Sequence, residues 1–158
     1  MDPSLNILVA EDNADDVFLL QQAFRKAGVG SRLQVVGDGA EALAYLKGEG
    51  AFRDRGNYPF PQVVLLDLNM PRLNGFEVLE ALRNDGQYRG LIIHVLSASA
   101  RDADVLRVYE LGANSYVVKP SRLDVLVDWV RALHQWHQFT VFPPRPTGVI
   151  SGNAIGGL

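Results

Sequence analysis

The residues of this sequence that could do chemistry together each follow a short β-favouring run. The apolar run Val63–Leu66 ends abruptly in the carboxylate of Asp67, and such a run is typical of a strand buried on both faces. The other runs end in two acids, a hydroxyl and an amine: Glu11, Asp12, Ser97 and Lys119. An isolated Asp after a strand is equally well explained as a helix cap or a turn residue. The role of Asp67 therefore depends on whether these groups meet.

Three carboxylates in one place repel one another and destabilise a fold unless a cation lies among them. Oxygen-only ligands with one or two direct carboxylates suit Mg²⁺ or Mn²⁺. A carboxylate at such a site can act as a nucleophile and form an aspartyl-phosphate. The metal would neutralise charge on Asp67 and on the incoming phosphoryl group. Lys119 would supply a second positive charge, and Ser97 could hydrogen-bond a phosphoryl oxygen. We therefore expect Asp67 to be the nucleophile.

The elements that must position these groups are five β-favouring runs that alternate with five helical patterns. The runs span residues 5–10, 32–36, 63–66, 91–96 and 115–118, and the helical patterns span residues 14–27, 40–47, 75–84, 100–111 and 123–139. This alternation is typical of an α/β fold with a parallel sheet, helices on both faces and right-handed crossovers. We predict a doubly wound five-stranded sheet of the flavodoxin-like order 2-1-3-4-5, which gathers four of the strand ends around one crevice.

Several local features extend this prediction. Asn74 is expected to cap the helix at residues 75–84. Ser99, with Asp102 three residues later, resembles a capping box for the next helix. The connection at residues 48–61 is long for a compact domain, so it is either a mobile surface insertion or a loop that faces a partner. His94 lies inside a strand pattern and is expected to be packed rather than catalytic.

Length and composition restrict the class of protein. A chain of 158 residues with 47% hydrophobic content is long enough for one ordinary domain. A net charge of −3 argues against a nucleic-acid-binding surface. The absence of cysteine excludes disulfides, thiolate catalysis and Cys-ligated zinc. Residues 1–4 do not resemble a signal peptide, and no apolar run is long enough to span a membrane. We expect a soluble, cytoplasmic protein.

In their order and intervals, these motifs resemble the receiver domains of two-component response regulators. The resemblance covers residues 5–139 and rests on four motifs: Glu11-Asp12, Leu65-Leu66-Asp67-Leu68-Asn69-Met70-Pro71 with Gly75, Ser97-Ala98 and Lys119-Pro120. It implies a signalling domain of the receiver fold that takes a phosphoryl group from a histidine kinase. Such a domain assists its own phosphorylation and dephosphorylation but is not an enzyme with a separate substrate.

The resemblance assigns the acids to a Mg²⁺ site around the phosphoryl acceptor. Asp67 is implied as the acceptor, and Asp12 and Asp67 are implied as direct metal ligands. Glu11 would act on the metal through a water molecule, and Asn69 would donate its backbone carbonyl.

Further roles follow from the same resemblance. Lys119 would contact the phosphoryl group, and the bond between Lys119 and Pro120 is expected to be cis. Ser97 would be the switch hydroxyl, and Tyr116 matches the aromatic residue that changes rotamer with it. Phe18 faces away from the core stripe of its helix, on the surface where the kinase docks in this family.

The long connection at residues 48–61 and the extended C-terminus look like those of single-domain regulators that partner bacterial phytochrome histidine kinases. We expect residues 1–139 to form the receiver domain and residues 140–158 to form a Pro/Gly-rich arm without an output domain. The signal would then leave by protein-protein contact, or by a phosphorelay to a histidine phosphotransfer (Hpt) protein.

The helix at residues 123–139 carries two apolar stripes, whereas a helix that packs on a sheet needs only one. The stripe expected on the sheet comprises Leu123, Leu126, Val127, Val130, Leu133 and His137. The second stripe comprises Val125, Trp129, Ala132 and Trp136. With Val141 and Phe142 of the arm, Trp129 and Trp136 predict an exposed surface and a homodimer. In the alternative, the arm folds back over Trp129 or Trp136 in its own subunit.

Three other classes of protein fit the motifs less well. A phosphohydrolase with an Asp nucleophile would need an acid two residues later, and that position is Asn69. A flavodoxin-like cofactor carrier would need hydroxyls and glycines in the first strand-helix turn, where Glu11, Asp12 and Asn13 stand. A receiver that has lost phosphorylation is disfavoured because no active-site residue is missing.

Overall fold

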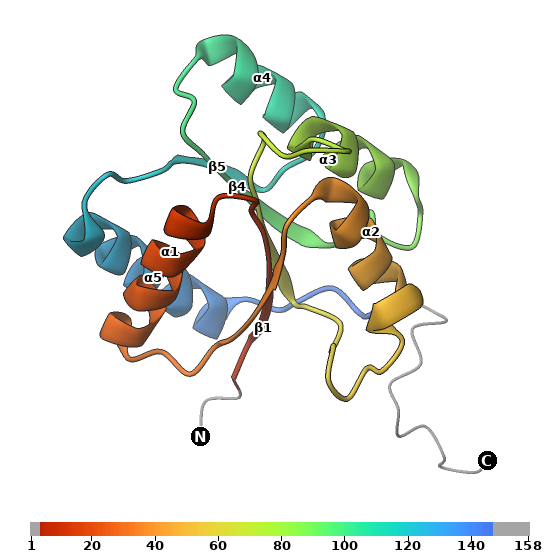
Figure 1. Cartoon of the computed structure of the whole chain (residues 1–158), viewed down its shortest axis with the longest axis horizontal. Helices are drawn as coiled ribbons and strands as arrows, with labels where there is room; N and C mark the ends of the chain where they lie inside the picture. Colours follow the sequence, from red (N-terminus) through yellow and green to blue (C-terminus); the bar gives the residue numbers. More distant parts are fainter. Residues whose placement is uncertain (1–3, 147–158) are drawn as a thin grey trace.

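The computed structural model describes residues 4–146 and confirms the predicted doubly wound fold. The strands are β1 (Asn6–Ala10), β2 (Arg32–Val36), β3 (Val63–Leu66), β4 (Ile92–Ser97) and β5 (Ser115–Val118). The helices are α1 (Ala14–Ala27), α2 (Gly39–Lys47), α3 (Gly75–Asn84), α4 (Asp102–Glu110) and α5 (Leu123–Phe139), with a short 3₁₀ helix η1 (Gly50–Phe52). All neighbouring strands are parallel, in the order β2-β1-β3-β4-β5. Figure 1 shows α1 and α5 side by side on one face of the sheet and the other three α-helices on the opposite face.

The sheet separates two apolar cores, because successive side chains of a strand point to opposite faces. In β1, Leu8 and Ala10 join the core under α2 and α3, whereas Ile7 and Val9 join the core under α1 and α5. The strands therefore have apolar residues on both faces, as their continuous apolar runs predict. Within residues 4–146, no helix has the length and apolar character needed to cross a membrane.

Helix caps fix where the helices begin. Asn74 caps α3 as predicted, and Glu77 completes the capping box with the backbone of Asn74. The capping box predicted at Ser99 is wrong, because α4 begins at Asp102 after Arg101. The Ser99 hydroxyl instead donates a hydrogen bond of 2.6 Å to the Asp104 carboxylate. The same hydroxyl accepts a hydrogen bond of 3.3 Å from the backbone N–H of Arg101, so Ser99 is tied to the start of α4 through its side chain.

The long connection between α2 and β3 is packed against the domain, which the sequence did not indicate. The Arg55 guanidinium donates hydrogen bonds to the carbonyl oxygens of Tyr45 (2.7 Å), Leu46 (2.8 Å) and Tyr58 (3.1 Å). It thereby joins the end of α2, where backbone carbonyls lack partners within the helix, to the loop that follows. The rings of Phe52 and Tyr58 pack on each other and on Tyr45, with centroids 5.1–6.1 Å apart.

The two stripes predicted on α5 are both present. The stripe on the sheet is buried at Leu126, Val127, Val130, Leu133 and His137. In the second stripe, Val125 and Trp136 are 45% and 44% exposed. Trp129 is half-buried and packs partly against the core under α1 and α5. His94 is buried as predicted, and its Nδ1 atom lies 2.6 Å from the Ser115 hydroxyl.

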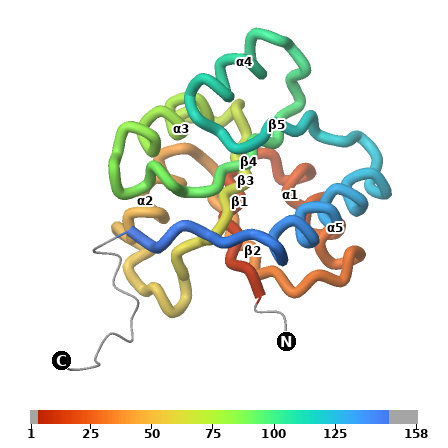
Figure 2. The backbone as a smooth tube through the Cα atoms, turned by 180° about the vertical axis from the view of Figure 1, so that it is seen from behind, coloured from red at the N-terminus to blue at the C-terminus, as the bar shows by residue number. Residues whose placement is uncertain are grey.

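The described part of the arm folds back across its own chain. Figure 2 shows it running from the end of α5 past the amino ends of the strands toward α2. Phe142 packs against the core under α1 and α5, and its ring centroid lies 5.7 Å from that of His137. Val141, by contrast, is 95% exposed. The expected arm continues to residue 158, and residues 147–158 lie outside the described part of the chain.

Candidate functional site

The carboxyl ends of β1 and β3 bring three of the predicted acids into one cluster. Ala10 pairs with Leu66 in the sheet, so the residues that follow these two strands lie side by side. Carboxylate oxygens of Glu11, Asp12 and Asp67 all lie within 4.8 Å of one another. Glu11 and Asp67 are buried, whereas Asp12 is exposed. The predicted convergence of these acids is therefore present.

Asp67 is not a helix cap, because α3 begins eight residues later behind Asn74. Its Oδ1 atom accepts a hydrogen bond of 2.8 Å from the backbone N–H of Leu68. A Cβ atom at Gly75 would lie 2.3 Å from the carbonyl oxygen of Asp67. Only glycine therefore lets the start of α3 pack this closely on the backbone of Asp67, which gives the glycine of the motif a physical reason.

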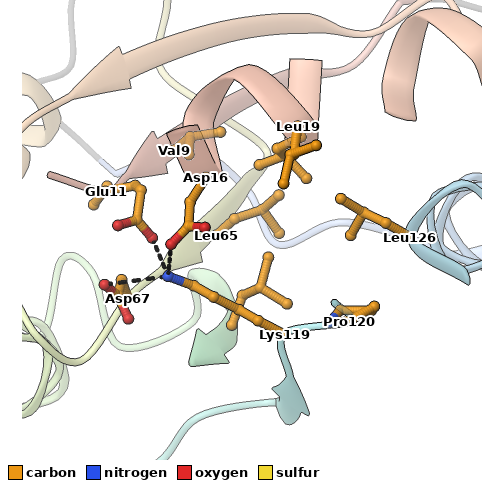
Figure 3. A pocket seen from close by; sticks show the side chains of 12 residues that line it. Val9, Glu11, Asp16, Leu19, Leu65, Asp67, Lys119, Pro120 and Leu126 are labelled. Atoms are coloured by element: carbon orange, nitrogen blue, oxygen red, sulfur yellow. Dashed lines mark hydrogen bonds and ion pairs between the residues drawn. The ribbon is translucent and has the colours of Figure 1, made fainter. Parts of the chain in front are cut away.

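The ammonium of Lys119 lies between three carboxylates, two of which belong to this cluster (Figure 3). Its Nζ atom is 2.6 Å from Glu11 Oε2, 2.8 Å from Asp16 Oδ2 and 3.5 Å from Asp67 Oδ2. The backbone N–H of Lys119 donates to the carbonyl oxygen of Ser97, which holds the end of β5 beside the end of β4. One ammonium group thus faces three carboxylates that come from α1 and from the ends of β1 and β3.

Burial and charge act in opposite directions on the pKa values of this cluster. Burial alone would lower the pKa of Lys119, but its hydrogen bonds to Asp16 and Glu11 and the charge of Asp67 outweigh burial and raise this pKa. Burial raises the pKa of Glu11 to about 7, although its hydrogen bond with Lys119 opposes the shift. Lys119 therefore keeps its proton, and the carboxylates around it carry more negative charge than one ammonium can balance.

Asp16 is a member of the site that sequence reasoning missed. Asp15 and Asp16 stand in the first turn of α1, where the helix dipole is a sufficient explanation for acids. The backbone N–H of Asp16 donates to the Asn13 side chain, which caps α1. The available signal was its position, because the first turn of α1 begins directly after Glu11, Asp12 and the cap Asn13 and so lies at the same end of the sheet.

The donor set fits a hard divalent cation. The clustered atoms are carboxylate oxygens, one acid is exposed to solvent, and the surplus negative charge has no second cationic side chain beside it among the described residues. Oxygen donors of this kind suit Mg²⁺ and Mn²⁺. Asn69 is exposed and lies two residues past Asp67 in the loop before α3. Its role as a carbonyl ligand stays a prediction.

Ser97 and Tyr116, the predicted switch residues, are linked through Ser99. The Ser97 hydroxyl is fully buried and accepts a hydrogen bond of 3.2 Å from the Ser99 backbone N–H. The Tyr116 hydroxyl donates a hydrogen bond of 2.8 Å to the Ser99 carbonyl oxygen. A movement of Ser97 toward the acid cluster would therefore disturb the peptide groups that Tyr116 contacts.

The prediction of a cis bond between Lys119 and Pro120 is wrong. Residues 4–146 contain no cis peptide bond. A trans bond before proline is the ordinary preference, by about 0.5–1 kcal/mol. Lys119 reaches the acids in this arrangement.

Phe18 lies on the surface of α1, two residues beyond Asp16. It is 57% exposed on α1, on the side turned away from the core, as predicted. Its role in docking a kinase stays a prediction.

The family model and the similar proteins all point to one family. Residues 7–131 match the family model of the response regulator receiver domain. Response regulator Rcp1 of Synechocystis sp. is 32% identical over 142 residues, which are 90% of this chain and 95% of that protein. The probable methanogenesis regulatory protein FilR2 of Methanothrix harundinacea is 33% identical over 130 residues, which are 82% of this chain and 81% of that protein.

Solved structures of similar proteins share the fold over nearly the whole chain. Response regulator RPA3017, of red light signalling in R. palustris, has a TM-score of 0.84 and 39% identity, covering 89% of this chain and 99% of its own. The phosphorylated cyanobacterial phytochrome response regulator RcpA has a TM-score of 0.80 and 33% identity, covering 90% of this chain and 100% of its own. The Mn²⁺-bound form of Rcp1 has a TM-score of 0.77 and 30% identity, covering 89% of this chain and 99% of its own.

Proposed function

This chain belongs to the response regulator receiver domain family, and we propose that it accepts a phosphoryl group from a sensor histidine kinase on Asp67. The observation that carries the proposal is the position of Asp67. It is a buried carboxylate with one oxygen held by the backbone of Leu68 and the other 3.5 Å from the ammonium of Lys119. Glu11 and Asp12 lie beside it. Stability of the sheet requires none of these charges.

The transfer needs an ionised Asp67 and a nearby cation. The Oδ2 atom of Asp67 attacks the phosphorus of the kinase phosphohistidine. The new O–P bond forms as the P–N bond breaks, and the electron pair stays on the imidazole nitrogen, which then takes a proton from solvent. Lys119 lies on the Oδ2 side of Asp67 and can hydrogen-bond an oxygen of the transferred group. Its positive charge stabilises the charge that gathers there.

The metal ligands in this proposal are Asp12 and Asp67 directly, Glu11 through a water molecule and Asn69 through its backbone carbonyl. When bound, a divalent cation neutralises charge on the phosphoryl group and on the acceptor. We propose Mg²⁺, and Mn²⁺ satisfies the same ligands. The cluster of carboxylate oxygens supports this assignment, as does the Mn²⁺-bound form of the similar Rcp1.

The phosphoryl group would be read out through Ser97 and Tyr116. A hydroxyl that turns to a phosphoryl oxygen gives up its hydrogen bond with the Ser99 backbone. Tyr116, which donates to the carbonyl of Ser99, then loses a fixed partner and can change rotamer. This coupling would pass the state of Asp67 to the loop between β4 and α4.

In this proposal the chain acts as a signalling domain. The proposal divides it into a receiver at residues 1–139 and an arm at residues 140–158. A phytochrome-type histidine kinase is the proposed partner, supported by similarity to RcpA, a cyanobacterial phytochrome response regulator. The signal leaves by contact with another protein or by phosphorelay to an Hpt protein.

Intact-mass measurement tests the acceptor. The protein is incubated with Mg²⁺ and a small phosphodonor such as phosphoramidate, and we expect the mass of one phosphoryl group to be gained and then lost in hydroxylamine. Asp67→Asn should abolish the gain. Asp38→Asn is the matched control, because Asp38 is also a buried aspartate but caps α2, a role that Asn fills equally well. Phosphorylation of Asp67→Asn at another residue would contradict the proposal.

We also propose a homodimer through the exposed side of α5 and the arm. Trp136, Phe139 and Val141 are 44%, 88% and 95% exposed, which is unusual for neighbouring large apolar residues. Trp129 and Phe142 lie beside them, half-buried against their own subunit. Sedimentation of a chain that ends at Phe139 and of Val141→Asp tests the arm, because Val141 has almost no contact to lose. A dimer unchanged by both would exclude the arm from the interface.

A further inference from the structure

Asp16 holds the amine that the proposed reaction needs. Its Oδ2 atom accepts a hydrogen bond of 2.8 Å from Lys119 Nζ, across 103 residues of sequence. The same ammonium is hydrogen-bonded to Glu11 at 2.6 Å but lies 3.5 Å from Asp67. Figure 3 shows the three carboxylates meeting at this one nitrogen. Lys119 is therefore bound to two acids and only near the third, which is the proposed acceptor.

The position of Asp16 directs it toward Lys119 rather than toward a metal. The oxygen cluster that could hold a cation comprises Glu11, Asp12 and Asp67, and Asp16 is not a member of it. Asp16 stands in the first turn of α1, where its backbone N–H is held by the Asn13 cap. Its side chain is 38% exposed, whereas that of Lys119 is 16% exposed. The helix thus presents a fixed, partly solvated carboxylate to a mostly buried ammonium.

The surroundings leave Lys119 free to change partners. A cavity of about 30 Å³ lies beside its side chain, between the acids and the leucines of α1 and α5. Its lining includes Leu19, Leu20 and Leu126 together with Asp16 and Lys119. A packed interior would resist any shift of the lysine stem, and this cavity lowers that resistance. The ammonium needs to move only from one carboxylate oxygen to a phosphoryl oxygen nearby.

We propose that Asp16 is a positioning residue that holds Lys119 in the unphosphorylated protein and releases it when a phosphoryl group arrives on Asp67. The proposal rests on the proposed function, since it takes Asp67 as the acceptor. No covalent bond to Asp16 forms or breaks. One hydrogen bond of the Lys119 ammonium passes from Asp16 Oδ2 to an oxygen of the phosphoryl group. Asp16 thereby stabilises the unphosphorylated state and sets how readily the site accepts a phosphoryl group.

Binding of a phosphoryl mimic measures this competition directly. Beryllium fluoride, which attaches to carboxylates as a phosphoryl group does, is titrated calorimetrically into the Mg²⁺-loaded full chain. We expect Asp16→Asn to bind about fivefold more tightly than the unaltered protein, the size of a partly exposed ion pair. Asp15→Asn is the matched control, because it removes the same charge from the same helical turn at an exposed position. It should change the affinity less than twofold. Asp16→Glu, which keeps a carboxylate, should bind beryllium fluoride with an affinity close to that of the unaltered protein.

A second measurement needs neither metal nor mimic. Lys26, Lys47 and Lys119 are the lysines of the sequence, and the first two are exposed. The ¹⁵N-labelled ammonium of Lys119 should therefore give a separate NMR signal, protected from hydrogen exchange by Glu11 and Asp16. We expect exchange to become several-fold faster in Asp16→Asn and to stay unchanged in Asp15→Asn. A purely structural role of Asp16 in α1 would lower the melting temperature without this selective change.

The outcomes separate the two proposals. If the unaltered protein takes no beryllium fluoride and no phosphoryl group, the proposed function fails. If it takes both but Asp16→Asn binds no more tightly than Asp15→Asn, the function stands and the role of Asp16 is overturned. Weaker binding in Asp16→Asn alone would also overturn it, because Asp16 would then assist the phosphorylated state.

Discussion

The polar groups at the carboxyl ends of the strands (the carboxyl edge of the sheet) are paired differently from those at the amino ends (the amino edge). At the carboxyl edge, Glu11, Asp16 and Asp67 surround the single ammonium of Lys119. At the amino edge, the single guanidinium of Arg55 donates to three backbone carbonyls, which carry no net charge. These three carbonyls at the amino edge therefore find their donor within the chain. The carboxyl edge keeps surplus negative charge that a bound cation would neutralise.

This contrast separates the contacts that stabilise the fold, at the amino edge, from the acids proposed for phosphorylation, at the carboxyl edge. The packed loop before β3, the arm and the buried histidines of β4 and α5 close the amino edge with apolar and aromatic contacts. The acids of the carboxyl edge cost stability in the absence of a cation. We therefore expect changes at the amino edge to affect folding with little effect on phosphorylation, and changes at the carboxyl edge to do the reverse.

The largest effect should come from acidifying the amino edge. Burial lowers the pKa of His94 from the usual 6.5 to about 4, and burial together with the neighbouring His94 and His134 lowers the pKa of His137 to about 4. In the unfolded chain these two histidines bind protons near pH 6.5, whereas in the folded chain they bind protons only near pH 4. The stabilising contribution is thus complete above pH 6.5 and is lost as the pH falls toward 4, by about 2 kcal/mol per histidine at pH 5.

Urea unfolding at pH 7.5 and at pH 5 measures this loss. His137→Phe keeps a ring beside Phe142 and removes one titrating group, so it should reduce the difference between the two pH values by about 2 kcal/mol. An unchanged difference would show that the histidines are not held neutral.

Arg55→Ala should produce the next largest effect. It deprives the carbonyls of Tyr45, Leu46 and Tyr58 of their donor and frees the loop that ends in β3. We expect a loss of about 3 kcal/mol in the free energy of unfolding, because partly buried acceptors are left unpaired. The matched control is Arg53→Ala, an exposed arginine in the same loop, which should cost under about 0.5 kcal/mol. Phosphorylation of Asp67 at low temperature should remain, and its loss would show that the two edges are coupled.

The contrast also explains what the sequence could predict. The strands and their order were predictable because β-favouring runs alternate with helical patterns along the chain. The acid cluster was predictable because each chemical residue directly follows its own strand pattern, as Asp67 follows Val63–Leu66. Asp16 was missed because its partner Lys119 is 103 residues away, and an acid in a first helical turn needs no partner to be explained. Arg55 was missed for another reason. It binds backbone carbonyls, which every residue carries, so no side chain in the sequence indicates its partners.

The smallest effect, and the one that best separates the edges, should come from Asp67→Asn. Without a metal, this change removes one of the repelling charges, while Lys119 keeps its hydrogen bonds to Glu11 and Asp16. We expect the metal-free variant to be more stable than the unaltered protein by about 1 kcal/mol. Saturating Mg²⁺ should reverse the order, because cation binding stabilises only a site that keeps its ligands. Thermal melts with Mg²⁺ and with a chelator test this reversal in the order of stability. Asp38→Asn, which changes a buried cap outside the cluster, should show no such reversal. A metal-free Asp67→Asn that is less stable would mean that Lys119 already balances the acids, and the carboxyl edge would then resemble the amino edge.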